Sequence, residues 1–147
     1  MSQLEELTQV ESTPAQGVQQ EQRPWGSWKI LDEGPGYKIK LIEVSPSHRL
    51  SLQYHHFRTE HWVVLSGRAR IVIGDKYQDL DMLQSVIIPE GVVHRIENPF
   101  KEPLQIVEVQ RGERLLEEDI VRLDDDYDRA DRIARAYRAP ITEGETA

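Results

Sequence analysis

Short runs of β-branched and aromatic residues alternate with turn residues through the middle of the chain, from Arg23 to Gly112. Runs of this kind, separated by Gly, Pro, Asp and Asn, predict β-strands. We expect strands at 27–31, 37–44, 48–55, 60–65, 68–74, 76–80, 85–89, 92–97 and 104–110. Gly74-Asp75 predicts a tight hairpin between two of them. Because no helical pattern of about 10 to 15 residues interrupts these strands, the fold class is all-β, a sandwich or barrel, and not a parallel βαβ sheet.

The two ends of the chain differ in composition from this middle part. Residues 1–22 are rich in Gln, Glu and Ser and predict a flexible N-terminal arm. Residues 113–147 begin as an acidic segment and continue into a predicted short C-terminal helix, whose apolar residues at helical spacing are Ile133, Ala134 and Tyr137. The chain therefore divides into an arm (1–22), a β-barrel (23–112) and an acidic segment with a C-terminal helix and tail (113–147).

Length and composition exclude several classes of protein. The 147 residues provide room for one hydrophobic core. The formal net charge of -8 argues against a nucleic-acid partner, because binding to phosphate backbones requires an excess of Lys and Arg. The chain has no cysteine, so disulfides and thiolate metal sites are excluded. Without a signal peptide or an apolar run near about 18 residues, we expect a soluble, cytoplasmic protein that binds no membrane.

Four polar residues have the spacing of a metal site. Gln53 and His55 are two residues apart, so in a strand their side chains lie on one face about 7 Å apart. Glu60 follows after a turn, and His94 comes from a distant segment, as when tertiary structure closes a metal site. Their nitrogen and oxygen donors suit a divalent metal such as Zn, Mn, Fe, Co or Ni.

The same residues lie within two motifs of a known superfamily. The first cupin motif resembles the segment that contains Ser47, Gln53, His55, Glu60 and Gly67. The second, P-x-G-x-x-H-x-x-x-N, is matched without a gap by Pro89, Gly91, His94 and Asn98. The resemblance implies a cupin fold, which is a double-stranded β-helix or jelly-roll barrel.

Longer strings resemble one cupin family, the type II phosphomannose isomerase domain: RPWGSW, GYKIKLIEV, RLSLQYHHFRTEHWVVLSG, IPEGVVHRIENP and EVQRG. In that family Gln53 belongs to the metal ligand set, and zinc is the favoured metal. The domain is often the C-terminal part of a bifunctional enzyme that begins with a mannose-1-phosphate guanylyltransferase. No Gly-rich nucleotide-binding loop precedes the barrel here, so we expect no guanylyl transfer.

The resemblance implies a metal-dependent mannose-6-phosphate isomerase. The enzyme would interconvert mannose 6-phosphate and fructose 6-phosphate through an enediol, in the synthesis of sugar-nucleotide and polysaccharide precursors. The chain departs from the family pattern at four positions: Trp28, Ser47, Tyr54 and Phe57. Phe57 stands where a third histidine is common, and this change bears on the substrate class. Two alternatives therefore stay open, a non-catalytic cupin that binds a sugar or sugar phosphate and another metal chemistry such as a dioxygenase.

Strand alternation adds candidates for binding a small-molecule sugar phosphate. Along 48–55, alternation places Arg49 and Ser51 on the same face as Gln53 and His55. The opposite, apolar face must then be covered by a second sheet, the N-terminal arm or a second subunit, and a homodimer is expected. Cations suit the phosphate, so the substrate-binding candidates are Arg49, Ser51, Lys40 and Arg23.

The catalytic candidates are Arg95, Glu108 and His61. Glu108 or His61 would serve as the general base of the isomerase. Arg95 directly follows His94, so strict alternation directs it to the opposite face of its strand.

Other residues that attract notice have simpler interpretations. We expect the three tryptophans, Trp25, Trp28 and Trp62, to lie in the core. The acidic run Asp124 to Asp126 is interpreted as a solvated face and not as a cation site.

Overall fold

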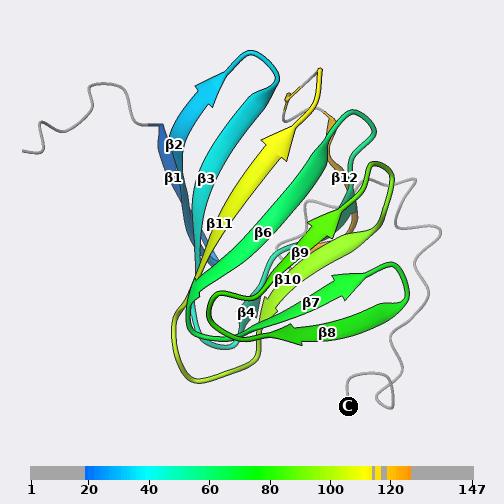
Figure 1. Ribbon diagram of the computed structural model, residues 1–147. Coiled ribbons are helices and arrows are strands. Elements are labelled where there is room, and N and C mark those ends of the chain that lie inside the picture. The colour runs from blue at the N-terminus through cyan, green and yellow to red at the C-terminus, as the bar shows by residue number, and fades with distance from the viewer. Residues whose placement is uncertain (1–18, 114, 117–118, 127–147) are drawn as a thin grey trace, which may run out of the picture.

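The computed structural model describes residues 19–113, 115–116 and 119–126, which form two antiparallel β-sheets that face each other (Figure 1). The first sheet has the strand order β1-β2-β3-β11-β6-β9 and comprises β1 (Gln20–Arg23), β2 (Gly26–Gly34), β3 (Tyr37–Val44), β11 (Leu104–Arg111), β6 (Thr59–Ser66) and β9 (Ser85–Ile88). The second has the order β12-β5-β10-β7-β8, with β4 beside β10, and comprises β12 (Val121–Asp124), β5 (Leu52–Tyr54), β10 (His94–Asn98), β7 (Ala69–Ile73), β8 (Lys76–Leu80) and β4 (His48–Arg49).

The strands predicted from hydrophobic patterning are confirmed, with one difference. The expected strand 48–55 is divided into β4 and β5, because residues 50–51 between them are not in strand conformation. β1 and β12 were not predicted, and β1 begins within the last residues of the expected arm and ends at Arg23. The predicted C-terminal helix lies outside the described residues. In the part of the chain that is described, no helix is long and apolar enough to cross a membrane.

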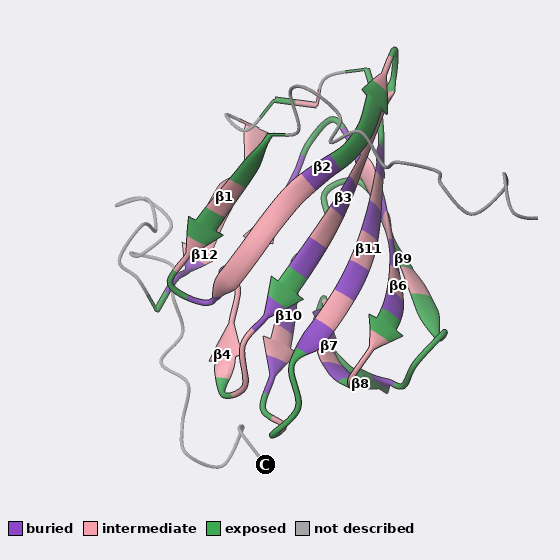
Figure 2. Cartoon of the chain, turned by 90° about the vertical axis from the view of Figure 1, so that its left-hand side faces the viewer, coloured by how far each residue is buried: buried purple, intermediate pink, exposed green. Residues whose placement is uncertain are grey.

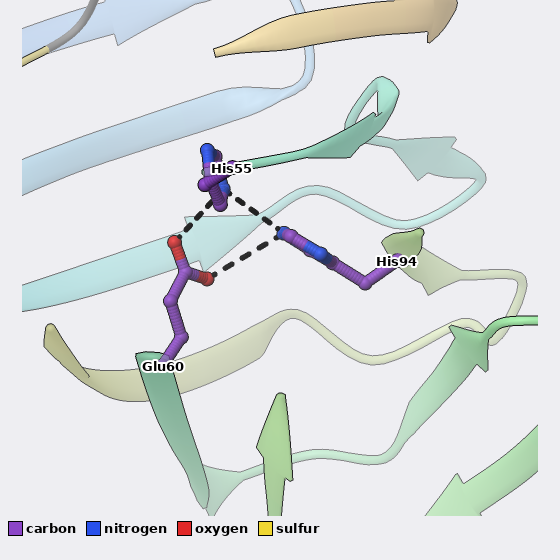
Figure 3. A group of neighbouring side chains, drawn as sticks. All are labelled: His55, Glu60 and His94. Carbon is purple, nitrogen blue, oxygen red and sulfur yellow. Dashed lines mark hydrogen bonds and ion pairs between the residues drawn. The ribbon is translucent and has the colours of Figure 1, made fainter. Parts of the chain in front are cut away.

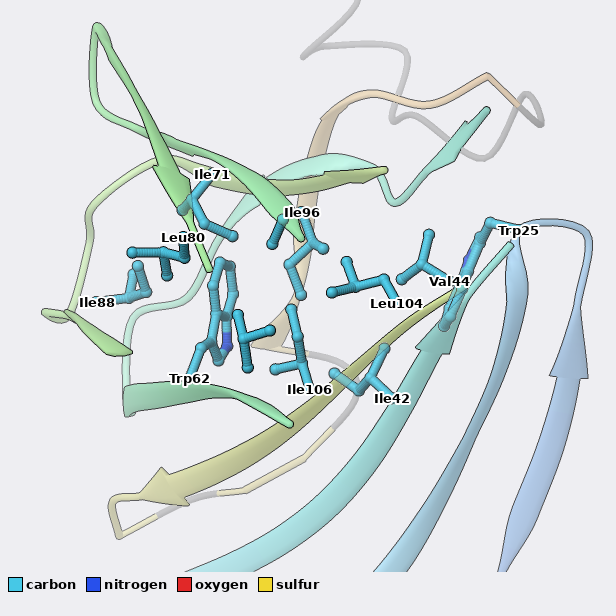
Figure 4. Close-up of a cluster of buried hydrophobic side chains, with 12 residues drawn as sticks. Trp25, Ile42, Val44, Trp62, Ile71, Leu80, Ile88, Ile96, Leu104 and Ile106 are labelled. Carbon is cyan, nitrogen blue, oxygen red and sulfur yellow. The ribbon is translucent and has the colours of Figure 1, made fainter. Parts of the chain in front are cut away.

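A hydrophobic cluster fills one part of the space between the sheets (Figure 4). It arises from strict alternation, and Figure 2 shows buried and less buried bands alternating along β3 and β11. The cluster consists of Trp25, Ile42, Val44, Trp62, Val64, Ala69, Ile71, Leu80, Ile88, Ile96, Leu104 and Ile106. Two of the three tryptophans are therefore core residues as expected, whereas Trp28 is only partly buried against the cluster.

The outward face of the first sheet also carries apolar side chains. Leu31, Leu65 and Ile87 are exposed there. The homodimer expected from the sequence stays a prediction.

Ser47 has a backbone φ of 62°, in the left-handed region that favours glycine. It stands where the cupin motif has glycine, and its N–H donates a hydrogen bond to Asn98 O at 2.8 Å. A residue that carries a Cβ atom is strained in this conformation. Ser47 therefore keeps the backbone conformation of the motif's glycine at a cost in stability.

Replacing Ser47 with glycine should therefore stabilise the fold. We expect Ser47→Gly to raise the free energy of unfolding by up to about 1 kcal/mol, since relief of the strain exceeds the extra backbone entropy of the unfolded chain. Chemical denaturation of both proteins measures the difference. The matched control is Ser45→Gly, a serine without positive φ, which should lose about 0.5–1 kcal/mol. A loss of stability in both variants would contradict the strain at Ser47.

Candidate metal centre and substrate pocket

Three buried side chains converge between the two sheets (Figure 3). Glu60 comes from β6 in the first sheet, His94 begins β10 in the second, and His55 directly follows β5. His55 Nε2 lies 3.0 Å from Glu60 Oε1, and His94 Nε2 lies 3.6 Å from Glu60 Oε2. The two Nε2 atoms are 3.1 Å apart. The side chains are only 1–2% exposed, so the three donors face one another away from bulk water.

Sheet register explains why these residues meet. On β6, Glu60, Trp62 and Val64 alternate inward, which directs the Glu60 carboxylate between the sheets. His94 on β10 lies directly opposite Gln53 on β5, and opposite residues in an antiparallel pair point to the same face. Gln53 thus lies on the same face beside the triad, and its Oε1 accepts a hydrogen bond from Ser51 Oγ at 2.9 Å.

The donor set fits a divalent metal ion. His94 Nδ1 lies 2.8 Å from Val92 O, and because a carbonyl can only accept, Nδ1 carries the proton and Nε2 keeps its lone pair. Burial lowers the pKa of His94, which favours the neutral imidazole that metals require. Two imidazole nitrogens and a carboxylate suit several first-row metals, zinc among them.

Glu60 is held ionised by its neighbours. Burial alone would raise the pKa of Glu60, but the hydrogen bond with His55 and the charges of His94 and Arg58 lower it strongly. Since burial lowers the pKa of His94, Arg58 is the permanent positive charge, with its Nε donating to Glu60 Oε1 at 2.9 Å. Trp62 Nε1 donates to the other oxygen, Oε2, at 3.0 Å. Both carboxylate oxygens therefore have partners.

A second buried carboxylate, Glu108 on β11, lies next to this centre. Its register neighbours are Lys40 on β3 and Trp62 on β6. Trp62 Nε1 also lies 3.0 Å from Glu108 Oε2, and Gln110 Nε2 donates to Oε1 at 2.5 Å. Burial raises the pKa of Glu108 to about 7, and the negative charge of Glu60 acts in the same direction. Glu108 is thus able to exchange a proton near neutral pH.

A pocket opens beside these groups. It is lined by Arg23, Trp25, Trp28, Lys40, Ile42, Leu50, Ser51, Gln53, Arg58, Glu108, Gln110, Ile120 and Arg122. Among the described residues, Arg58 Nη1 and Gln110 Oε1 are buried without a hydrogen-bond partner. Because unpaired buried polar atoms are costly, these two atoms are available to a polar ligand.

The structure places five of the sequence-predicted residues at the pocket: Arg23, Lys40, Ser51, Gln53 and Glu108. Sequence reasoning missed Arg58, Gln110 and Arg122. The signal for Arg58 was its position between the candidate ligands His55 and Glu60, and the signal for Gln110 was strand alternation from Glu108. Arg122 had no comparable signal, because its strand was not predicted.

Arg49 lies elsewhere. It makes two hydrogen bonds to Asp126, at 2.8 and 2.9 Å, and a third to Glu97 at 3.3 Å. Alternation across 48–55 was wrong because the strand breaks at residues 50–51, and Leu50 lines the pocket together with Ser51 and Gln53.

Arg95 and His61 are also outside the pocket. Arg95 is buried on the face of β10 opposite His94 and donates to Leu50 O and to Asp124. His61 is half-buried on the outward face of β6, between Ile87 and Val109 in register. Of the three catalytic candidates, the structure brings only Glu108 to the pocket.

Two further expectations concern residues around the site. Phe57 is 47% exposed and does not line the pocket, so its difference from the family pattern does not alter the pocket wall.

The interpretation of Asp124 to Asp126 as a solvated face was wrong, since Asp124 and Asp125 are buried. The reason is that this run contains part of β12, which pairs with β5.

Comparison with known proteins agrees with this arrangement. Residues 11–125 match the family described as "Mannose-6-phosphate isomerase C-terminal". The chain belongs to this family. Its relatives include the xanthan biosynthesis protein XanB of Xanthomonas campestris pv. campestris, which is 50% identical over 107 residues, or 73% of this chain and 23% of XanB. The alginate biosynthesis protein AlgA of Pseudomonas aeruginosa is 51% identical over 107 residues, or 73% of this chain and 22% of AlgA.

A third relative is the mannose-1-phosphate guanylyltransferase ManC of Salmonella typhimurium. It is 46% identical over 73% of this chain and 22% of ManC. The chain thus spans less than a quarter of the length of these three relatives.

Solved structures support the cupin fold. A protein with a double-stranded β-helix domain from Klebsiella pneumoniae aligns with a TM-score of 0.55 at 22% identity, covering 58% of this chain and 75% of that chain. Oxalate decarboxylase from Bacillus subtilis aligns with a TM-score of 0.66 at 16% identity, covering 72% of this chain and 30% of that chain. At these identities the likeness shows the fold alone, so the prediction of a double-stranded β-helix is confirmed.

The raised pKa of Glu108 predicts a pH effect on stability in protein freed of metal by a chelator. Between the ordinary pKa of 4.5 and about 7, folded Glu108 binds a proton that the unfolded chain has released, so its contribution to stability falls as pH rises through this window. We expect Glu108→Gln to gain stability relative to the parent protein between pH 5 and pH 8, measured by denaturant unfolding. The control is Glu102→Gln at an exposed position, which should track the parent. A stability difference between Glu108→Gln and the parent that stays constant from pH 5 to pH 8 would contradict the raised pKa.

Proposed function

We propose that this protein is a metal-dependent isomerase that interconverts mannose 6-phosphate and fructose 6-phosphate. The observation that carries the proposal is the closeness of the His55, Glu60 and His94 triad to Glu108 in a chain from this family: Trp62 Nε1 lies 3.0 Å from both Glu60 and Glu108. Glu108 is a buried proton-exchanging group that lines the adjoining pocket. The names of XanB and AlgA, two biosynthesis proteins for xanthan and alginate, support a role in supplying polysaccharide precursors.

The metal would be held by His55, Glu60 and His94, with Gln53 as the fourth donor. Zinc is our proposed ion, since imidazole nitrogens and a carboxylate oxygen are among the donors that bind it. When bound, such an ion supplies a Lewis acid that polarises the sugar oxygens at C1 and C2.

The chain's own residues would move the proton. In the open-chain aldose, Glu108 would remove the proton from C2 and return it to C1 after the enediol forms, while the hydroxyl proton of the C2 oxygen moves to the C1 oxygen. A group with a pKa near neutrality can exchange the carbon-bound proton in both directions. Arg58 Nη1, an unpaired donor, and Gln110 Oε1, an unpaired acceptor, would bind and orient sugar hydroxyls.

The phosphate would lie toward the cations of the pocket. Lys40 and Arg23 line it and remain candidates, with Ser51 nearby. Arg49 and Arg95 are not included, because their guanidinium groups bind Asp126 and Asp124.

The metal-loaded protein should convert mannose 6-phosphate in a coupled assay for fructose 6-phosphate. His55→Ala should lower turnover roughly a hundredfold or more, because a ligand is lost, and should lower the bound metal measured by elemental analysis. The matched control is the adjacent exposed histidine, His56→Ala, which should retain both metal and turnover. Ligand-induced thermal stabilisation without turnover in the parent protein would favour a binding cupin and reject the isomerase.

Glu108→Gln should lower kcat by about 10²- to 10⁴-fold while metal content stays unchanged, because the variant loses proton transfer but keeps the three ligands. The parent protein should gain activity as pH rises toward and past about 7, where Glu108 loses its proton, and the variant should lack this rise. Steady-state kinetics across pH measure both effects. Glu102→Gln serves as the control, and a Glu108→Gln variant with parental kcat would exclude Glu108 as the base.

A further inference from the structure

We propose that residues 121–126, which are β12 and the two residues after it, form a strap that closes the pocket and supplies Arg122 as a binding residue for a phosphate monoester. Two ion pairs outside the pocket, Arg49 with Asp126 and Arg95 with Asp124, fix the strap in place. The inference rests on the proposed function only for the identity of the ester, a sugar 6-phosphate.

Register places Arg122 in line with the metal centre. Arg122 on β12 lies opposite Gln53 on β5, and Gln53 lies opposite His94 on β10. These three residues therefore form one row across neighbouring strands, and Arg122 and Gln53 both line the pocket. Strands are about 4.8 Å apart, so β12 is about 10 Å from the strand of His94. That separation suits a ligand with its carbonyl end at the metal and its phosphate at the far end.

The charge of the pocket differs in sign from that of the chain. Four of its lining residues are cations, Arg23, Lys40, Arg58 and Arg122, and one, Glu108, is acidic. The whole chain has a formal net charge of -8. Of these cations, Arg58 also binds Glu60, with its Nε donating to Glu60 Oε1. A cationic pocket on an acidic protein concentrates anions, and the planar guanidinium of Arg122 matches phosphate oxygens.

The strap depends on contacts beyond its own ladder. β12 has only four residues, and its pairing with β5 is interrupted by a register shift between Arg122 and Asp124. Strands this short are weakly held by pairing alone. Asp126 receives two hydrogen bonds from Arg49, at 2.8 and 2.9 Å. Such a bidentate pair fixes orientation as well as distance.

The second ion pair is buried. Arg95 Nη2 donates to Asp124 Oδ2 and to the Asp124 carbonyl, each at 3.2 Å, and Arg95 Nε donates to Leu50 O at 2.9 Å. It thereby joins the strap to the pocket residue Leu50. Ahead of β12, Asp119 accepts hydrogen bonds from the backbone N–H groups of His56 and Phe57, both at 3.0 Å. Arg49, Arg95 and Asp126 are thus positioning residues that act on Arg122 through the strap.

The test measures binding of inorganic phosphate to the metal-loaded full chain by isothermal titration calorimetry. Arg122→Ala should weaken phosphate binding roughly tenfold or more, as expected for losing a charge-assisted hydrogen bond, while metal content stays at the parental level. Arg122→Lys should recover part of the affinity, because the charge returns without the planar fork. Arg70→Ala is the control, since Arg70 is also an arginine on a strand of the second sheet but lies on β7 away from the pocket.

The strap is tested with Asp126→Asn in the kinetic assay. This variant should raise KM for mannose 6-phosphate severalfold with little change in kcat, because it loosens Arg122 and leaves the metal ligands and Glu108 in place. Circular dichroism checks that each variant is folded, and Arg122→Gln replaces Arg122→Ala if the alanine variant unfolds.

The outcomes separate this inference from the proposed function. Parental phosphate affinity in folded Arg122→Ala or Arg122→Gln, or an equal loss in Arg70→Ala, overturns the inference even if the protein is an isomerase. Loss of phosphate binding in the Arg122 variants together with no turnover in the parent protein supports the strap and rejects the isomerase.

Discussion

The arrangement of the site depends on one constraint, the ionised carboxylate of Glu60 between two sheets. Removing such a charge from water costs several kcal/mol unless opposite charge and hydrogen bonds replace the solvent. Arg58 and Trp62 each bind one of its oxygens, and the His55 and His94 nitrogens face it. These partners come from two strands, β6 and β10, and from the loop between β5 and β6, so the charge of Glu60 requires the two sheets to meet in one register. The same requirement gathers the donors that a metal needs.

The interior of the barrel is accordingly divided into an apolar part and a polar part. Along β11, Leu104 and Ile106 face the hydrophobic cluster, and Glu108 and Gln110 continue the same inward row into the pocket. Alternation is thus unchanged along the strand while the chemistry of the inward residues changes. The hydrophobic cluster provides a rigid support, and the polar part presents side chains whose positions that support determines.

The sequence predicted the strands from local alternation, which identified inward positions on long strands. The two motifs pointed to His55, Glu60 and His94, side chains that meet only in the folded chain. It failed for Arg49, because alternation holds only along a continuous strand and this one breaks at residues 50–51. β1 and β12 are four-residue edge strands with polar sequences, QEQR and VRLD. Their strand conformation comes from pairing with neighbours, which propensity does not report.

Trp62 is a core residue that is needed for its hydrogen-bond donor as well as for the size of its ring. Its ring belongs to the hydrophobic cluster, yet its single N–H is shared between Glu60 and Glu108. Phenylalanine would provide much of the apolar contact but would leave two buried carboxylates without their common donor. Position 62 is thus constrained by hydrogen bonding at one edge of the ring and by packing around the rest. Substitutions that an ordinary core site would accept are therefore expected to be selected against here.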